Sequence, residues 1–360
     1  MNKLDIAVIP GDGVGPEVIP EAIKTLKAVS EVHGGLSFTF TEFPWGCDYY
    51  LKTGRMMDEH GLRALRDYHA ILLGAVGAPN LVPDHVSLWG LLLPIRKSFD
   101  QYVNLRPIKL LRGVPGRLVG KGPEDIDFVV VRENTEGEYS GVGGRVHVGT
   151  PFEVAVQSNI FTRTGVERVV RYAFELARER NKAKRVVSVT KSNACNYSMV
   201  FWDEVFHEIA AEYPDIEATQ VHVDAAAMYV ITQPEWFDVV VATNLFGDIL
   251  TDEGAAIQGS IGLAAGANLN PEKKYPSMFE PIHGSAPDIA GKGIANPIGT
   301  IWSAALMLDF FEYQDLGNLL LSAIEQTLLS DGLKLADFCG SATTSEIGDL
   351  ICNNIYRLAT

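Results

Sequence analysis

The stretch from Val239 to Ala255 reads VVVATNLFGDILTDEGA. Four apolar residues suit a buried strand, and after a short turn the sequence predicts a helix that begins near Gly247. Asp248 and Asp252 are four positions apart, which places both carboxylates on one face of that helix. Two neighbouring anions repel, and a hard divalent cation with oxygen ligands, Mg²⁺ or Mn²⁺, would hold them together. The alternative is that Asp248 caps the helix and Asp252 is an ordinary surface residue.

Composition limits the class of protein. The chain has 360 residues, enough for two lobes with separate cores, and 47% of them are hydrophobic. A formal net charge of -15 argues against partners such as nucleic acid or an anionic membrane surface, although local basic clusters can still bind an anionic substrate. The four cysteines are scattered without metal-binding spacing, and no apolar run is long enough to span a membrane. We therefore expect reduced thiols and a cytoplasmic location.

The N-terminal segment has the order strand, glycine turn, helix. A buried strand is predicted over Leu4 to Ile9, and a helix is predicted to start at Pro16. Between them, Gly11, Gly13 and Gly15 lack the spacing of the dinucleotide-binding fingerprint, so we interpret them as a structural turn. Further strands are predicted at residues 37–42 and 70–74, and the alternation of strands and helices indicates an α/β fold with a mostly parallel sheet.

Charged residues follow several predicted strands. Apolar runs end at Arg132, Lys191 and Asp224, and a fourth run leads to Asp248. Ligands of open α/β sheets collect at the carboxyl ends of strands, so this mixture predicts a polyanion gripped by arginine and bridged by metal, with Lys191 as a proton carrier. For any one of these residues the alternative is a charge that merely marks where a strand meets water.

Three further residues are candidates for the same site. Arg96 and Arg106 flank a helix end and the next strand, and arginine offers a fixed fork of donors to carboxylates. Tyr139 lies among glycines in the segment 134–149, where it can line a pocket as a phenol donor. Alternating residues that continue to Val156 favour a second interpretation, a β-hairpin arm that pairs with another subunit.

A long loop is predicted over Ser277 to Pro297, after a boundary near Gly259. It contains His283 and Asp288 among prolines, glycines and small residues, which suits a loop that wraps a flat ligand, with Asp288 bonded to the hydroxyls of a ribose. The alternative is an Ω-loop that packs on itself. The following segment, residues 301–311, is apolar on every side and predicts a buried helix.

Several motifs together resemble the β-decarboxylating dehydrogenases, a family that includes the isocitrate, isopropylmalate and tartrate/D-malate dehydrogenases. The motifs are GDGVGPE, the Arg96 and Arg106 pair, VRENTEGEYSG, TKSN, VDAAAM, NLFGDILTDEGA and EPIHGSAPDIAGKGIANP. The resemblance covers nearly the whole chain. It implies a two-lobed isopropylmalate dehydrogenase-like α/β fold, not a Rossmann fold, with a β-arm for dimerisation. The expected lobes are residues 1–103 with 259–360, and residues 104–258.

The resemblance also implies roles for single residues. Three arginines bind substrate carboxylates: Arg96, Arg106 and Arg132. Three aspartates bind the metal: Asp248, Asp252 and, from the neighbouring subunit, Asp224. Lys191, also from the neighbour, helps to remove the proton of the C2 hydroxyl, and Tyr139 protonates the enol carbon after CO2 leaves. The adenosine-binding loop contributes six residues: His283, Gly284, Ser285, Ala286, Asp288 and Asn296.

The implied cofactors are NAD and Mg²⁺ or Mn²⁺, with K⁺ as a candidate monovalent ion. NAD is favoured over NADP because the Asp288 carboxylate would repel a 2′-phosphate. The implied partners are a small dicarboxylate and a second copy of the chain, in a homodimer with a shared active site. Ser87 and Trp89 are expected to set substrate specificity, since the Trp89 indole would exclude large C3 groups. This favours the tartrate/D-malate branch over isopropylmalate or isocitrate dehydrogenase, while intact site residues disfavour a non-catalytic subunit.

Overall fold

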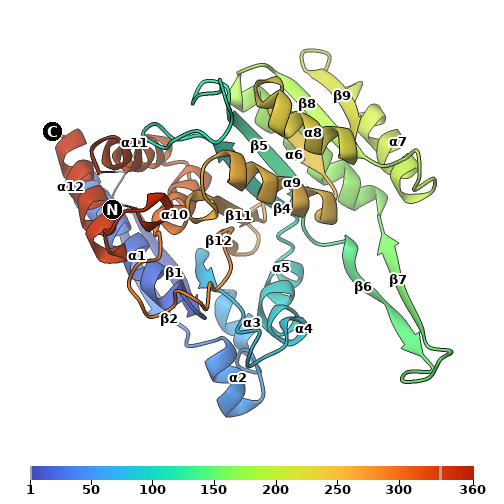
Figure 1. Cartoon of the computed structure of the whole chain (residues 1–360), viewed down its shortest axis with the longest axis horizontal. Coiled ribbons are helices and arrows are strands. Elements are labelled where there is room, and N and C mark those ends of the chain that lie inside the picture. Colours follow the sequence, from blue (N-terminus) through green and yellow to red (C-terminus); the bar gives the residue numbers. More distant parts are fainter. Residues whose placement is uncertain (1, 332–334) are drawn as a thin grey trace. The chain divides into compact units, whose positions relative to one another are not determined.

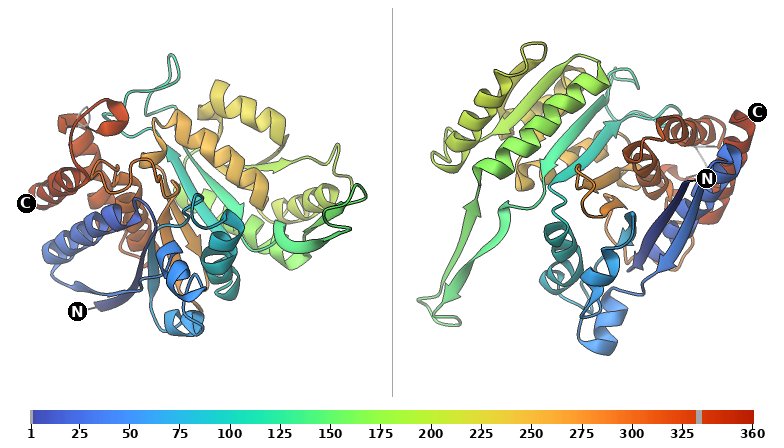
Figure 2. Two further views of the ribbon diagram at one scale, coloured as in Figure 1. Left: turned by 60° about the horizontal axis from the view of Figure 1, so that its bottom comes forward. Right: turned by 180° about the vertical axis from the view of Figure 1, so that it is seen from behind.

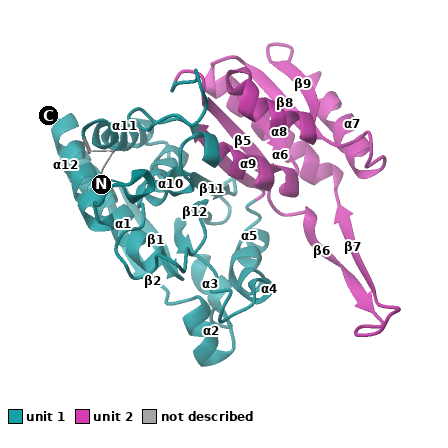
Figure 3. Ribbon diagram, in the orientation of Figure 1, with its two compact units in different colours: residues 1–101, 109–123, 255–360 teal, residues 102–108, 124–254 magenta. Residues whose placement is uncertain are grey.

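The computed structural model describes residues 2–331 and 335–360. The chain forms two compact units (Figure 3). Unit 1 comprises residues 1–101, 109–123 and 255–360, and unit 2 comprises residues 102–108 and 124–254. The expected lobes had boundaries at 103/104 and 258/259. In the structure the chain also returns to unit 1 for residues 109–123 before it completes unit 2.

The strands of unit 1 lie in the order β2, β1, β3, β12, β11. Their bounds are Asn2–Gly11 for β1, Leu36–Glu42 for β2, Ala70–Ala75 for β3, Ala265–Leu269 for β11 and Ser277–Pro281 for β12. The strands are parallel except β11, which runs antiparallel to β12. All six residues of β3 are buried, as its apolar run predicts. The loop predicted from Ser277 is wrong in its first five residues, because they pair with β3 and β11 as strand β12.

Four long helices belong to unit 1: α1 (Gly15–His33), α10 (Ile298–Phe310), α11 (Gln314–Asp331) and α12 (Thr344–Leu358). Helix α10 is buried on nearly every side, which confirms the buried helix predicted there. Helices α1 and α12 lie side by side, as the blue and red helices of Figure 2 show. Lys24 of α1 joins them through an ion pair of 2.6 Å with Asp349. Helix α12 starts with a capping box formed by Thr343 and Glu346.

Shorter helices complete unit 1: α2 (Cys47–Thr53), α3 (Gly61–Leu65), α4 (Asp84–Ser87) and α5 (Leu93–Ser98). A π-helical segment, Leu88–Leu92, connects α4 with α5. Leu91 and Leu93 are buried, whereas Leu92 is only partly buried. π-Helical turns are rare and frequent near functional sites, and this one carries Trp89.

The strands of unit 2 lie in the order β4, β5, β10, β8, β9. Their bounds are Val103–Lys109 for β4, Asp127–Glu133 for β5, Arg185–Thr190 for β8, Glu217–His222 for β9 and Val239–Ala242 for β10. The strands β5, β10, β8 and β9 are mutually parallel. Ala242 at the end of β10 pairs with Arg132 near the end of β5. The residues that follow these two strands therefore lie at the same edge of the sheet.

The main helices of unit 2 are α6 (Arg163–Arg180), α7 (Ser198–Ala210), α8 (Val223–Thr232) and α9 (Asn244–Ile257). Two boundaries differ from the prediction. Helix α9 begins at Asn244, not near Gly247, so Asp248 lies inside the helix and is not its cap. Strand β9 ends at His222, and Asp224 therefore lies in the first turn of α8 instead of at a strand end.

A two-stranded arm extends from unit 2 (Figure 1). It consists of β6 (Gly137–Val146) and β7 (Val154–Ile160), which pair antiparallel. The predicted hairpin is thus present, and Tyr139 lies in its first strand. Several apolar side chains of the arm are exposed, among them Val142, Val156 and Phe152. In the described ranges, no helix is long and apolar enough to cross a bilayer.

Candidate active site

Asp248 is the centre of a charged cluster in unit 2. Its Oδ1 accepts hydrogen bonds from Arg132 and, at 3.2 Å, from Nη1 of Arg106. Its Oδ2 accepts a hydrogen bond of 3.0 Å from the hydroxyl of Tyr139. Four residues that the sequence predicted for one site therefore meet around a single carboxylate. They come from β4, β5, β6 and α9, whose positions in the chain span more than a hundred residues.

Both arginines of this cluster are held by neutral oxygens as well. Arg132, with 1% of its surface exposed, donates from Nε and Nη2 to Oδ1 of Asn244 at 3.1 and 2.6 Å. Arg106 donates from Nη1 to the hydroxyl of Thr251 at 2.6 Å. These bonds orient buried guanidinium groups that would otherwise lose their hydration without compensation.

Asn244 and Thr251 were not predicted as site residues. Both stand inside the quoted stretch, and a signal was present: Asn244 follows strand β10 closely, and Thr251 lies between the two aspartates on α9. The residues predicted at these strand ends are all charged, whereas Asn244 and Thr251 are neutral. Neutral side chains that orient charged ones belong to the same edge of the sheet and are found by the same rule.

Burial and charge affect two acids in the cluster. Burial raises the pKa of the Tyr139 phenol, the negative Asp248 raises it further, and Arg132 opposes the change. Tyr139 is therefore a neutral hydrogen-bond donor at physiological pH. Partial burial also raises the pKa of Asp252, with Asp248 acting in the same direction and Arg106 against it. A cation beside Asp248 and Asp252 would relieve this unfavourable proximity.

Lys191 and Asp224 form a separate ion pair in unit 2. Lys191 Nζ lies 2.8 Å from Oδ1 of Asp224, and 69% of the Asp224 side chain is exposed. The hydrogen bond from Lys191 lowers the pKa of Asp224. Within the described ranges of one chain, no three Asp, Glu, His or Cys side chains are grouped to hold a metal, so Asp224 does not join the carboxylates of α9 there. Whether it joins those of a second chain remains a prediction.

Arg96 lies in unit 1, on helix α5. It is buried, and its Nη2 donates to Oε1 of Glu280 at 2.6 Å. Asn268 donates to the same oxygen at 2.7 Å. The Nε of Arg96 is also buried and has no partner among the described residues. Glu280, which sequence reasoning missed, thus positions this arginine.

The two expected specificity residues differ in environment. Ser87 is buried, and its hydroxyl donates to the carbonyl of Asp84 at 3.2 Å. Trp89 is 45% exposed, with the Lys97 ammonium 4.6 Å from its ring centroid. Such a cation–π contact restrains the indole. The role of both residues in substrate choice stays a prediction.

The turn after β1 supports the predicted cofactor loop through backbone contacts. The amide of Val14 donates to the carbonyl of Ser285 at 2.9 Å. Gly13 has a φ of +58°, and a Cβ added to it would lie 1.9 Å from the Ser285 carbonyl oxygen. Asp12 accepts hydrogen bonds from two backbone amides, those of Cys47 and Gly77. The glycine turn is therefore structural, as predicted, and it sets the position of the 285 region.

The loop residues themselves offer few side-chain contacts to protein. His283 shares a hydrogen bond of 2.9 Å with the Gly284 carbonyl, burial lowers the pKa of its imidazole, and its Nε2 is buried without a partner in the described ranges. Ala286 has a φ of +41°. Asp288 is exposed. Asn296 is anchored to Asp337 at 2.7 Å. A neutral His283 whose Nε2 has no partner in the described ranges fits a loop that hydrogen-bonds a ligand.

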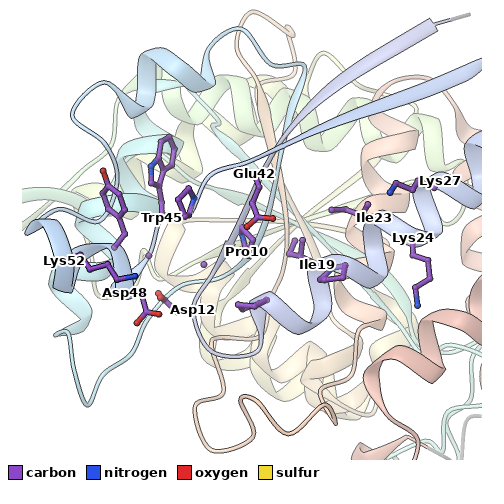
Figure 4. A pocket seen from close by; sticks show the side chains of 16 residues that line it. Pro10, Asp12, Ile19, Ile23, Lys24, Lys27, Glu42, Trp45, Asp48 and Lys52 are labelled. Atoms are coloured by element: carbon purple, nitrogen blue, oxygen red, sulfur yellow. The ribbon is translucent and has the colours of Figure 1, made fainter.

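A pocket of about 780 Å³ also lies in unit 1, against α1 and α2 (Figure 4). Lys52, Asp48 and Asp12 lie at one end of it, and Lys24 and Lys27 lie at the other. None of the predicted site residues lines this pocket. It is therefore separate from the candidate active site.

Comparison with known proteins agrees with this arrangement. Residues 5–351 match the family model described as isocitrate/isopropylmalate dehydrogenase. The chain is 55% identical to a probable tartrate dehydrogenase/decarboxylase of Bacillus subtilis over 99% of both chains. It is 53% identical to a D-malate dehydrogenase (decarboxylating) of Escherichia coli, covering 99% of this chain and 100% of the relative.

A solved structure shows the same likeness. The isocitrate dehydrogenase of Methylococcus capsulatus matches with a TM-score of 0.87 and 33% identity over 99% of both chains. The predicted isopropylmalate dehydrogenase-like fold is confirmed, and so is the predicted resemblance to the tartrate and D-malate enzymes. The chain therefore belongs to the isocitrate/isopropylmalate dehydrogenase family.

Proposed function

We propose that this protein catalyses the NAD-dependent oxidative decarboxylation of a small 2-hydroxy dicarboxylic acid, D-malate or a tartrate. The observation that carries the proposal is the contact of Arg106, Arg132 and Tyr139 with Asp248. It gathers carboxylate-binding, metal-binding and proton-donating groups around one point. Two similar proteins are named as decarboxylating enzymes for tartrate and D-malate. Members of this family generally depend on NAD(P) and a divalent metal.

The arginines bind the substrate. Arg106 and Arg132 present positive charge beside Asp248 and are already oriented by Thr251 and Asn244. A dicarboxylate that binds at this cluster exchanges its hydration for charge-assisted hydrogen bonds. Arg96 is the proposed partner of its second carboxylate. Because the guanidinium groups are fixed before substrate arrives, little ordering is left to do on binding.

The residues present fit both a divalent metal ion and NAD. Asp248 and Asp252 supply the hard oxygen donors that Mg²⁺ or Mn²⁺ prefers, with Asp224 of a second subunit as the third ligand. When bound, the cation supplies Lewis-acid stabilisation of negative charge on the substrate oxygen at C2. The loop from His283 to Asn296 holds the adenosine of NAD, and Asp288 favours NAD over NADP by charge repulsion of a 2′-phosphate.

Two residues move protons. Lys191, as the neutral amine, would accept the proton of the C2 hydroxyl, and bound NAD would supply the hydride acceptor that oxidises C2 to a ketone. The carboxylate on C3 then leaves as CO2, and its bonding electrons form an enolate. Tyr139 donates a proton to C3 of that enolate, which is consistent with a phenol whose pKa is raised by burial and by Asp248. For D-malate and NAD⁺ the products are pyruvate, CO2 and NADH.

The first experiment is NADH formation by the purified protein with Mn²⁺. D-malate, L-tartrate, meso-tartrate, 3-isopropylmalate and isocitrate are compared, each with and without EDTA. We expect chelator-sensitive turnover of D-malate or a tartrate and little turnover of the bulkier acids, because the Trp89 indole restricts the C3 group. Preference for 3-isopropylmalate or isocitrate would retain the mechanism and reject the substrate class. Absence of NADH with every acid would reject the proposed function.

We also infer a homodimer in which Lys191 and Asp224 serve the partner's site. Their mutual ion pair keeps both charges together without engaging the carboxylates of α9 in the same chain. Lys191→Ala and Arg96→Ala are each expected to be inactive, whereas subunit exchange between them should restore activity at one of the two sites of a mixed dimer. The measurement is NADH formation after co-refolding, with the separately refolded variants as the control. Absence of complementation in verified mixed dimers would reject the shared site.

A further inference from the structure

Three glutamates of one short segment, Glu133, Glu136 and Glu138, each accept a hydrogen bond from a backbone amide. Glu133 is fully buried and accepts from the amides of Thr135 and Glu136, both at 2.9 Å. Glu136 accepts from the amide of Thr162 at 2.8 Å at the base of the arm. Glu138 accepts from residues at the start of helix α9. All three carboxylates therefore replace backbone partners that an irregular segment lacks.

Glu138 ties strand β6 to the start of helix α9. Its Oε1 accepts from the hydroxyl of Thr243 at 3.0 Å, and its Oε2 accepts from the amide of Leu245 at 3.1 Å. Only 8% of the residue is exposed. The amide of Leu245 lies in the first turn of α9, where backbone donors lack helical partners and the helix dipole favours an anion. The carboxylate thus pairs an amide of the first helical turn that has no helical partner.

The two groups that Glu138 joins carry the proposed chemistry. Tyr139 is the next residue along β6, and Asp248 is three residues beyond Leu245 on α9. The phenol and the carboxylate meet at 3.0 Å, although 109 positions separate them in the chain. The backbone carbonyl of Glu138 also accepts from the Gln157 side chain at 2.8 Å, which fixes this end of β6 to β7.

We propose that Glu138 is a positioning residue that holds the Tyr139 phenol at its working distance from Asp248. The inference rests on the proposed function, since it concerns the residue that delivers a proton to C3. Without the Glu138 carboxylate, β6 is still paired with β7 but loses its side-chain attachment to the start of α9. Proton donation by Tyr139 then becomes slow, while hydride transfer from C2 depends on other groups and is affected less.

The test separates the two chemical steps. Decarboxylation is measured with oxaloacetate and Mn²⁺, and hydride transfer is measured as the pre-steady-state NADH signal with the preferred substrate. The variants are Glu138→Ala, Glu138→Gln, Tyr139→Phe and the double variant Glu138→Ala/Tyr139→Phe. Glu136→Gln is the matched control, because it alters a carboxylate two positions away that is bonded to Thr162 and not to α9.

We expect Glu138→Ala to slow decarboxylation by about 10- to 100-fold, with a smaller effect on hydride transfer. Glu138→Gln should recover most of the rate, since an amide can still accept from Leu245 and meet the Thr243 hydroxyl. The double variant should be no slower in decarboxylation than Tyr139→Phe, because the two residues act through one group. Glu136→Gln should leave the ratio of the decarboxylation rate to the hydride-transfer rate as it is in the wild type.

Other results overturn the inference. Equal loss of both steps in Glu138→Ala, additivity with Tyr139→Phe, or an unchanged rate would each reject a positioning role. If Glu138→Ala does not fold, Thr243→Val removes one of the two carboxylate partners and must show the same selective loss on a smaller scale. The wild-type protein in the same assays tests the proposed function independently, because its failure to form NADH would reject that function whatever the variants do.

Discussion

The charged cluster of unit 2 and the predicted cofactor loop of unit 1 hold their candidate residues in different ways. In unit 2, side chains bind side chains: Arg106, Arg132 and Tyr139 all contact Asp248. In unit 1, the loop that contains Ser285 is held by backbone contacts with the turn at Gly13. Side-chain contacts therefore arrange the charges of unit 2, whereas backbone contacts set the position of the loop in unit 1. Substitutions in unit 2 should therefore remove chemistry and leave the fold, whereas those at the turn in unit 1 should change affinity and stability together.

The largest effect is expected at the centre of the charged cluster. Asp248→Asn keeps the size of the side chain but removes the negative charge that a divalent cation requires. We expect turnover at saturating Mn²⁺ to fall by at least about 100-fold. Far-UV circular dichroism should be unchanged, and the melting temperature should move by a few degrees at most. NADH formation over a Mn²⁺ titration is the measurement.

A matched control is Asp215→Asn, which removes a carboxylate of unit 2 paired at the surface with Arg178. It should leave turnover unchanged, because exposed ion pairs contribute little. Full activity of Asp248→Asn at saturating Mn²⁺ would contradict the metal assignment. It would also remove the main contrast between the two units.

A smaller effect is expected at the glycine turn of unit 1. Ala at position 13 must adopt a left-handed φ near +58°, and its Cβ would collide with the Ser285 carbonyl. We expect Gly13→Ala to raise the KM for NAD about tenfold, which corresponds to about 1.4 kcal/mol. The melting temperature should also fall. Steady-state kinetics with NAD as the varied substrate and a thermal melt measure the two effects.

The control for this change is Gly116→Ala in the same unit, where an added Cβ meets nothing closer than 3.2 Å. Its KM for NAD should equal that of the wild type. If Gly13→Ala instead lowered turnover at saturating NAD and left the KM for NAD and the melting temperature unchanged, the backbone contact would not be what positions the loop.

The smallest effect is expected for Asp309 in unit 1, whose carboxyl group, among the described residues, is not stabilised by arginines as that of Asp248 is in unit 2. Desolvation on α10 raises the pKa of Asp309 to about 6 although the residue as a whole is exposed, and no cation within the described ranges offsets the change. The folded state therefore holds the proton more tightly than the unfolded chain, and stability falls as pH rises from about 4 through 6. Asp309→Asn should raise the melting temperature by about 2 °C at pH 7.5. The gain should shrink at pH 5, and an equal gain at both pH values would contradict this account.

Much of the charged site follows from the sequence. Residues after parallel strands meet at one edge of a sheet, so Arg132 and Asp248 were expected to lie together, and they do. The same rule brings Asp224 beside Lys191, because they follow the parallel neighbours β9 and β8, although helix α8 begins directly after His222 and holds Asp224 in its first turn. The start of α9 was placed three residues late, since Asn244 reads as well in a turn as in a helix.

Contacts between distant residues were harder to predict. The bond between Arg96 and Glu280 joins positions 184 apart, and the contact between Gly13 and Ser285 spans a larger separation. No periodic pattern in the sequence indicates either contact, because both depend on the pairing of β12 with β3. Glu138 was overlooked because it adjoins a more conspicuous phenol and because its partners, Thr243 and the Leu245 amide, are neutral.

The pairing of β3 with β12 has a consequence for synthesis of the protein. Strand β3 can pair with β1 as soon as both have left the ribosome, but its other edge stays open until β12 emerges about 200 residues later. At 5–20 residues per second this interval lasts about 10 to 40 s. All six residues of β3 are buried in the finished fold, so the waiting edge is both apolar and rich in unpaired backbone groups. A nascent chain stalled in this interval is the form in which aggregation competes most strongly with folding, and the form that a ribosome-associated chaperone would protect.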